Sequence, residues 1–266
     1  MQNGGVPRTD HAFLDGPHPR AFVHRGWHCG ELAGMENSLT AFRRAVTEGY
    51  HYVETDVHAT SDGTVVVHHD SLLDRTTDGV GPIAEQPWSA VRRAKVGGRE
   101  PIAALADVLE ELPDTRFNID IKADRAVEPA MALLRRMNAL PRVAIASFSE
   151  RRLARARLLG GAETLTSLGP RSVATLWAAG RLIRRAGRPL PGLMAQIPVR
   201  HGPMVLVNER MVRVAHRAGI EVHVWTVDEP AEMNRLLDLG VDGLLSDRPD
   251  LLRAELSRRG VWLGTS

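Results

Sequence analysis

Cysteine is almost absent from this chain of 266 residues, in which Cys29 is the only one. No disulfide can therefore form within the chain, and nothing favours an oxidising compartment. Long apolar runs are also missing, because no window approaches the roughly 18 apolar residues of a membrane-spanning helix. The opening residues, MQNGGVPRTDHAFLDGPHPR, lack the basic and then apolar order of a secretory signal peptide. These absences predict a soluble cytoplasmic protein with no integral membrane segment.

An excess of charge of one sign is missing as well, since the formal net charge is only +2. No basic run is interleaved with aromatic residues, so the composition argues against a nucleic-acid partner. The sequence contains neither the G-x-S-x-G motif of hydrolase nucleophiles nor a phosphate-binding G-x-x-x-x-G-K loop. Lysine is scarce, with Lys95 and Lys122 as the only two against a background of arginine. Because arginine is the default cation here, each retained lysine is informative.

Strand-like and helix-like patterns alternate along almost the whole chain. Residues 1–19 are rich in glycine, proline and polar residues, which predicts a flexible tail. Helical spacing follows in segments such as NSLTAFRRAVTEGY, where Asn37 or Ser38 is the expected N-cap. The expected strands are Ala21–His24, Tyr52–Ala59, Thr64–His68, Arg116–Ile121, Arg142–Ser147, Glu163–Ser167, Leu193–Pro198, Gly219–Thr226 and Gly243–Ser246.

This alternation predicts an α/β fold with a parallel sheet. About eight strand-helix units within residues 20–266 favour a single closed (β/α)8 domain, the TIM barrel. An open dinucleotide-binding sheet is disfavoured, because no G-x-G-x-x-G follows the first strand. The turn-rich segment 72–102 predicts a small insertion after the second strand.

Charged residues and histidines stand at the carboxyl ends of several predicted strands. In a barrel these ends converge on one face, which is where barrel enzymes place their active sites. Most of these positions end apolar runs, where charge is not expected by chance. The residues are His24, Arg25, Glu54, Asp56, His69, Asp70, Asp120 and Lys122.

Two carboxylates, Glu54 and Asp56, stand two residues apart in YVETDVHAT, so a strand presents both on one face. Like charges on one face repel unless a cation lies between them, and oxygen ligands select a hard ion such as Mg²⁺ or Ca²⁺. Asp120 and Lys122 repeat the spacing in FNIDIK, which adds a third carboxylate and a group able to bind an anionic substrate. Salt bridges are the structural alternative for these residues.

Two histidines, His24 and His69, end different predicted strands. Imidazole titrates near neutral pH, so such a pair can serve as general base and general acid. In TVVVHHD, the alternation of a strand sends His68 and His69 to opposite sides, so only one of them faces the site. The sequence does not assign the base and the acid within the pair.

Several motifs in order along the chain resemble the glycerophosphodiester phosphodiesterase family. They are HRG, ENSLTAF, VETDVHATSDGTVVVHHDSLLDRTTDGVG, NIDIK, VHVWTVDEP and GVDGLLSDRPD, between about residues 21 and 252. The resemblance implies a TIM barrel that hydrolyses small glycerophosphodiesters to glycerol 3-phosphate and an alcohol, with one divalent cation, Mg²⁺ or Ca²⁺. It also implies a place in lipid and glycerol metabolism.

The resemblance assigns roles by position. It implies a catalytic pair, three metal ligands and four substrate-binding residues. His24 and His69 match the catalytic pair, Glu54, Asp56 and Asp120 the metal ligands, and Arg25, Lys122, Trp225 and Asn37 the substrate-binding residues. Asp120 departs from the family pattern, in which many members have glutamate, so coordination through water is an option there. Trp225 has packing within the barrel as its alternative role.

Three other functions fit parts of the pattern. A phospholipase D-like enzyme on the same barrel would act on lysophospholipids or sphingolipids, but secreted enzymes of that group carry disulfides. A non-catalytic binding module would be expected to lack a histidine or an acidic ligand, and this chain has them all. An unrelated barrel enzyme of sugar or aldol chemistry would leave the His24-Arg25 pair and His69 unexplained. The preferred alcohol and the oligomeric state are open.

Overall fold

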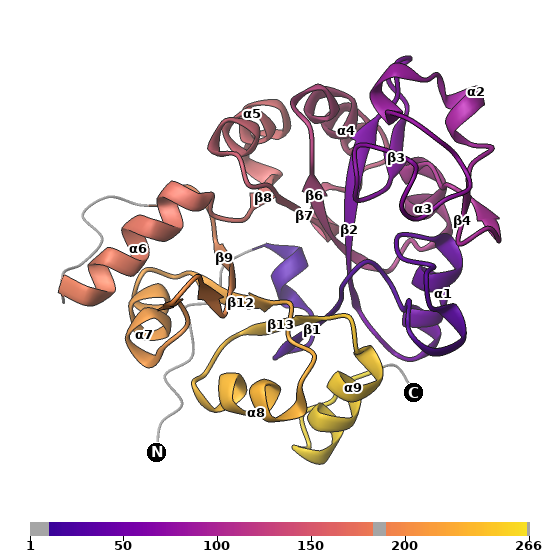
Figure 1. The fold of residues 1–266 in the computed structure, drawn as a ribbon. Helices are drawn as coiled ribbons and strands as arrows, with labels where there is room; N and C mark the ends of the chain where they lie inside the picture. The colour runs from indigo at the N-terminus through magenta and orange to yellow at the C-terminus, as the bar shows by residue number, and fades with distance from the viewer. Residues whose placement is uncertain (1–10, 183–189, 265–266) are drawn as a thin grey trace.

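The computed structural model describes residues 11–182 and 190–264, and these residues build a barrel ringed by helices (Figure 1). Eight parallel strands of the described chain pair in the order β8-β7-β6-β2-β1-β13-β12-β9, and a parallel bridge between Ser167 and Met194 links the two end strands. The predicted TIM barrel is therefore confirmed. The barrel strands are β1 (Arg20–Val23), β2 (Tyr52–Ala59), β6 (Arg116–Ile121), β7 (Val143–Ala146), β8 (Leu165–Thr166), β9 (Met194–Pro198), β12 (Glu221–Trp225) and β13 (Gly243–Ser246).

Helices surround the strands because each buries one apolar stripe against the sheet. In α1, for example, Ala41, Phe42 and Ala45 are buried, and the Ser38 hydroxyl caps the helix by accepting the Ala41 N–H. The outer helices are α1 (Leu39–Thr47), α3 (Leu105–Glu111), α4 (Asp124–Arg136), α5 (Glu150–Gly160), α6 (Pro170–Leu182), α7 (Glu209–Arg217), α8 (Pro230–Asp238) and α9 (Pro249–Arg258). No helix within the described ranges is long and apolar enough to cross a membrane.

A small insertion follows the second barrel strand, as the sequence predicted. The predicted strand Thr64–His68 appears as β3 (Val65–Val67), but it pairs antiparallel with β2 and is not a barrel strand. The next residues form α2 (Trp88–Val91) and the pair β4 (Lys95–Val96) and β5 (Glu100–Pro101). This segment has an apolar cluster of its own, made of Val66, Leu73, Ile83, Val91, Ala94, Val96 and Ile102. A second short hairpin, β10 (Arg200–His201) and β11 (Met204–Val205), follows β9.

The segment before β1 differs from the predicted flexible tail from residue 11 onward. A short 3₁₀ helix at Ala12–Asp15 buries Phe13 and Leu14, and the Phe13 ring centroid lies 5.2 Å from that of Tyr52. Tyr52 begins β2, so this helix covers the amino-terminal end of the barrel. The physical reason is the apolar Phe13-Leu14 pair, which finds a place in the core although its neighbours are polar. Residues 1–10 of the predicted tail lie outside the described residues.

Gly16 follows this helix and lies against Tyr52. A Cβ built at position 16 would be 2.3 Å from the Tyr52 hydroxyl oxygen, well inside contact distance. We therefore expect Gly16→Ala to lower the free energy of unfolding by about 1–3 kcal/mol, the usual cost of overpacking a core. Urea denaturation measures the change. A loss below about 0.5 kcal/mol, typical of surface substitutions, would show that the segment does not pack on the barrel.

A buried ion pair also closes this end of the barrel. The Arg20 guanidinium donates to both carboxylate oxygens of Glu221 at 2.6 Å and to the Tyr52 hydroxyl at 2.8 Å. His223, fully buried inside the barrel, lies 2.9 Å from Glu221 Oε2 through its Nε2 atom. Burial opposes ionisation of Glu221, but its bonds to Arg20 and His223 outweigh that effect and lower its pKa to about 2. The negative charge of Glu221 therefore depends on its bonded partners.

Candidate active site

The three predicted metal-ligand carboxylates lie together inside the barrel. Glu54 and Asp56 are on β2, and Asp120 on β6 stands opposite Asp56 in the parallel register. Their exposed fractions are only 4%, 1% and 6%, although each is a carboxylate. The two-residue spacing therefore places the side chains on one face, as predicted from the alternation of strands.

Lys122 provides the positive charge next to these carboxylates. Its Nζ atom lies 2.7 Å from Asp56 Oδ1 and 2.8 Å from Asp120 Oδ2. Burial acts to lower the pKa of Lys122, but Asp56 and Asp120 outweigh it, so the pKa is raised and the group is an ammonium ion. The lysine predicted to bind an anionic substrate is thus held at the centre of the carboxylate cluster.

The carboxylates differ in charge state. Burial and the nearby charge of Asp56 raise the pKa of Glu54 to about 8. Asp56 is the opposite case, because Lys122 and Arg25 outweigh its burial and lower its pKa. The raised pKa of Glu54 shows that three carboxyl groups are crowded together in this buried site. A positive charge bound beside them would favour the ionised form of Glu54.

Arg25 lies at the same end of the barrel in a left-handed backbone conformation, with φ of 55°. This turn lets its backbone N–H donate to Glu54 Oε2 at 3.1 Å. Its side chain approaches Asp56, with Nε 3.4 Å from Oδ2, and donates from Nη1 to Glu36 Oε1 at 3.1 Å. The Nε atom is buried and makes no hydrogen bond of its own. Arg25 thus brings a guanidinium group with an unused donor to the site.

His24 ends β1 beside the carboxylates. Its Nε2 atom is 3.7 Å from Glu54 Oε2, and its Nδ1 atom is 2.7 Å from Asp247 Oδ1. Burial acts to lower the pKa of His24, but the charges of Glu54 and Asp247 outweigh it and the pKa is raised. Sequence reasoning missed Asp247, although it directly follows β13 and so stands at the same strand-end position as the residues that were chosen.

His69 has a carboxylate partner as well. Its Nδ1 atom lies 2.5 Å from Asp70 Oδ1, and Arg75 donates from Nε to the other oxygen of Asp70 at 2.6 Å. Arg75 also donates to Glu36, the same carboxylate that binds Arg25, so one chain of ion pairs joins the two halves of the site. The pKa of Asp56 is lowered chiefly by Lys122 and Arg25, with a smaller contribution from His69. The sequence offered Arg75 and Glu36 only as parts of two family-like motifs, SLLDRTTDGVG and ENSLTAF, and no role was predicted for either residue.

Two predicted substrate-binding residues occupy different surroundings. Asn37 is 1% exposed, and its side chain donates to Asp56 Oδ2 at 2.9 Å and accepts from the Thr55 hydroxyl at 2.7 Å. It is therefore buried against the carboxylates, where its amide group supports Asp56. Trp225 ends β12 at the same end of the barrel, and its ring meets the exposed ring of Phe148 edge to face with centroids 5.6 Å apart.

Comparison with known proteins identifies the family of this site. Residues 24–251 match the family model described as the glycerophosphoryl diester phosphodiesterase family. The chain belongs to this family. Membership makes it an enzyme of the phosphoric diester hydrolase class, which confirms the family and the activity class predicted from the sequence motifs.

Relatives within the family share most of the chain. The curated protein named probable glycerophosphodiester phosphodiesterase 2 of Mycobacterium tuberculosis is 41% identical and covers 99% of this chain and 100% of its own. Lysophospholipase D GDPD1 of Mus musculus is 25% identical over 88% of this chain and 85% of its own. An Oleispira antarctica phosphodiesterase, solved in complex with the product sn-glycerol-3-phosphate, shares the fold with a TM-score of 0.72. It is 21% identical and covers 90% of this chain and 97% of its own.

The donor set of the family member fits a hard divalent cation. All three carboxylates supply oxygen, which Mg²⁺ and Ca²⁺ prefer. Asp120 Oδ1 is buried without a hydrogen-bond partner, which leaves an oxygen free for an ion. Within residues 11–182 and 190–264, however, no three such side chains are already arranged to hold a metal ion. The ammonium group of Lys122 instead draws Asp56 and Asp120 toward itself.

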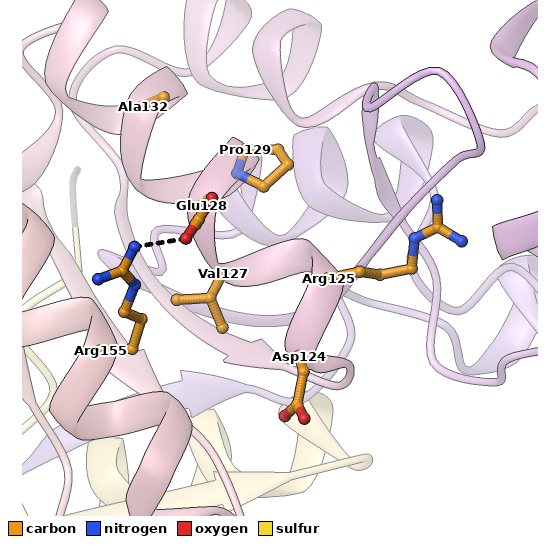
Figure 2. Close-up of a pocket in the computed structure, with 7 residues that line it drawn as sticks. All are labelled: Asp124, Arg125, Val127, Glu128, Pro129, Ala132 and Arg155. Atoms are coloured by element: carbon orange, nitrogen blue, oxygen red, sulfur yellow. Dashed lines mark hydrogen bonds and ion pairs between the residues drawn. The ribbon is translucent and has the colours of Figure 1, made fainter.

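A groove on the outer side of α4 lies away from this chemistry. Figure 2 shows its lining, in which Glu128 and Arg155 point toward each other as an ion pair with N–O distance 2.5 Å. Asp124 at its edge is paired with Arg151 and Arg152. These charged groups are matched to one another, and no predicted site residue lines the groove. The predicted site residues lie instead at the carboxyl end of the barrel.

Proposed function

We propose that this protein hydrolyses glycerophosphodiesters to glycerol 3-phosphate and an alcohol, and that it depends on one divalent cation, Mg²⁺ or Ca²⁺. The observation that carries the proposal is the group of three buried carboxylates flanked by two histidines, each of which has its own carboxylate partner. The product complex of the Oleispira relative supports the choice of substrate. Residues 20–266 act as one phosphodiesterase domain.

Glu54, Asp56 and Asp120 would hold the cation, whose charge stabilises the negative oxygens of the phosphodiester as it reacts. Arg25 and Lys122 bind the same oxygens, because a guanidinium and an ammonium group complement a phosphate. Both groups pair with Asp56 in the structure, so a bound phosphate would share them with that carboxylate. Asn37 holds Asp56 in place through its amide group.

His24 and His69 move the protons of the reaction. One imidazole takes the proton from the attacking hydroxyl, which belongs to water or to the neighbouring glycerol hydroxyl of the substrate. The other gives a proton to the leaving alkoxide, which departs poorly without one. Trp225, paired with Phe148 at the mouth, contacts the alcohol part of the substrate.

Release of glycerol 3-phosphate tests this function. The panel contains glycerophosphodiesters of choline, ethanolamine, glycerol and inositol, each with Mg²⁺, with Ca²⁺ or with EDTA. We expect release with a metal ion and none in EDTA, with recovery on adding the ion back. Lysophosphatidylcholine is added to the panel because one relative is named a lysophospholipase D. Release of choline from lysophosphatidylcholine alone would overturn the glycerophosphodiester assignment in favour of a phospholipase D-like activity.

Asp120 offers a test of the metal site that does not depend on turnover. We expect Asp120→Asn to weaken Mg²⁺ or Ca²⁺ binding at least about tenfold, since it removes the charge of one ligand. Asp120→Glu should retain binding, because glutamate keeps the carboxylate. Isothermal titration calorimetry measures the affinities, and Asp114→Asn, an exposed change near the opposite end of β6, is the matched control. Equal affinity in Asp120→Asn and the control would contradict a role for Asp120 as a ligand.

A further inference from the structure

We propose that Asp247 is a positioning residue for the catalytic His24, which it orients by holding the proton on Nδ1 and thereby directing Nε2 into the site. The inference rests on the proposed function, because it takes His24 as one of the two proton-transfer groups. It goes beyond that function by adding the residue that follows β13 to the machinery and by defining which ring atom of His24 reacts.

The argument begins with the 2.7 Å contact between His24 Nδ1 and Asp247 Oδ1. A carboxylate accepts hydrogen bonds and has no proton to donate, so Nδ1 must carry the proton. In the neutral ring Nε2 is then the atom with a free lone pair. Nε2 is also the atom that faces the carboxylate cluster, 3.7 Å from Glu54 Oε2. Asp247 therefore fixes both the tautomer and the direction of the imidazole.

Asp247 can do this because its own position is fixed. Its backbone N–H donates to Asp228 Oδ1 at 2.8 Å, and the Ser246 hydroxyl donates to the same oxygen at 2.9 Å. The backbone N–H of Arg248 in turn donates to the Ser246 hydroxyl at 3.0 Å. Three hydrogen bonds thus hold the turn between β13 and α9, and they leave Asp247 Oδ1 pointing at the histidine.

A second histidine, His28, contacts the same oxygen of Asp247. His28 Nε2 lies 2.9 Å from Asp247 Oδ1, so two imidazoles share one acceptor atom. His24 and His28 both belong to the segment after β1, and β1 pairs directly with β13, with Val23 opposite Ser246. The carboxylate therefore bridges the ends of two neighbouring strands. Such a bridge sets the distance between His24 and the carboxylates on β2, and catalysis is sensitive to that distance.

Three variants separate positioning from general structural damage. We expect Asp247→Ala to lower kcat by about 10²-fold or more, as happens when a catalytic imidazole loses the carboxylate that orients it, with KM nearly unchanged. Asp247→Asn keeps an acceptor oxygen but adds an amide N–H that donates to Nδ1 in the other tautomer, so its kcat should also stay well below the native value. Asp250→Ala is the matched control, because this nearby carboxylate binds Arg248 and the Cys29 thiol and does not contact His24. Equal kcat values for the Asp247→Ala and Asp250→Ala variants would overturn the proposal.

The tautomer of His24 can be measured by a method that does not depend on activity. With ¹⁵N-labelled histidine, at a pH where the ring is neutral, NMR distinguishes a proton on Nδ1 from one on Nε2. We expect the Nδ1 form of His24 in the native protein and in Asp250→Ala, and a shift toward the Nε2 form in Asp247→Ala. An unchanged tautomer in Asp247→Ala would overturn the proposal. If the native protein released no glycerol 3-phosphate, the proposed function would fail, whereas the spectrum would still report on Asp247.

Discussion

Replacement of either His24 or His69 by alanine is expected to lower kcat for glycerophosphodiester hydrolysis by about 10²–10⁴-fold, the usual contribution of a general acid or base. The two histidines end different strands, and each has its own acidic partner, Asp247 for His24 and Asp70 for His69, so neither can replace the other. KM should change little, because Arg25 and Lys122 remain to bind the phosphate. Steady-state kinetics on glycerophosphocholine with saturating metal measures both constants.

His51→Ala is the matched control for these two variants. His51 immediately precedes β2 at the opposite end of the barrel, where its ring contacts the carbonyl oxygen of Leu263 at 3.0 Å. Its removal should leave kcat within about twofold of the native value, as for other surface changes away from the site. Near-native kcat in His24→Ala or in His69→Ala would exclude the two-histidine mechanism.

The second large effect is on stability. We expect Glu221→Gln to lower the free energy of unfolding by about 3–5 kcal/mol, because it leaves the buried Arg20 charge without its partner. Arg20 is 4% exposed, so water cannot take the place of the carboxylate. Urea denaturation at pH 7 measures the loss. The double variant Arg20→Met/Glu221→Leu, which removes both charges, should be more stable than Glu221→Gln, and the reverse order would contradict this account.

The same ion pair makes stability depend on pH. The pKa of Glu221 is about 2 in the folded protein against an ordinary value of 4.5, so the folded state favours the ionised form. Its contribution is therefore fully present above pH 4.5 and is lost as the pH falls from 4.5 toward 2. The difference between these values corresponds to about 3 kcal/mol. The difference in free energy of unfolding between the native protein and Glu221→Gln should therefore decrease as the pH falls from 4.5 toward 2. A difference that does not change with pH would contradict the lowered pKa of Glu221.

Much of the fold and site could be predicted from the sequence because strand patterning is local. The limits of β2, β6 and β13 agree with the predicted runs, and the two-residue spacing of Glu54 and Asp56 was enough to place both on one face. The barrel rule then gathered His24 with them, although it stands on another strand. These inferences needed only alternation and the convergence of strand ends.

What the sequence did not reveal depends on contacts between distant segments. Asp247 meets His24 from the far end of the chain, and no spacing within either segment indicates that contact. The apolar Phe13-Leu14 pair is short and lies in a largely polar segment, so its packing under the barrel follows only from contacts with distant strands. The antiparallel pairing of β3 could not be predicted either, because a short apolar run is compatible with a parallel or an antiparallel strand.

Isotope transfer from water is the most direct test of the central claim, that this barrel cleaves a phosphodiester at the bond between phosphorus and the alcohol oxygen. Glycerophosphocholine is hydrolysed in H₂¹⁸O with saturating metal, and both products are examined by mass spectrometry. The account predicts one ¹⁸O atom in the phosphate of glycerol 3-phosphate and none in choline. Label in choline, or no glycerol 3-phosphate at all, would contradict it.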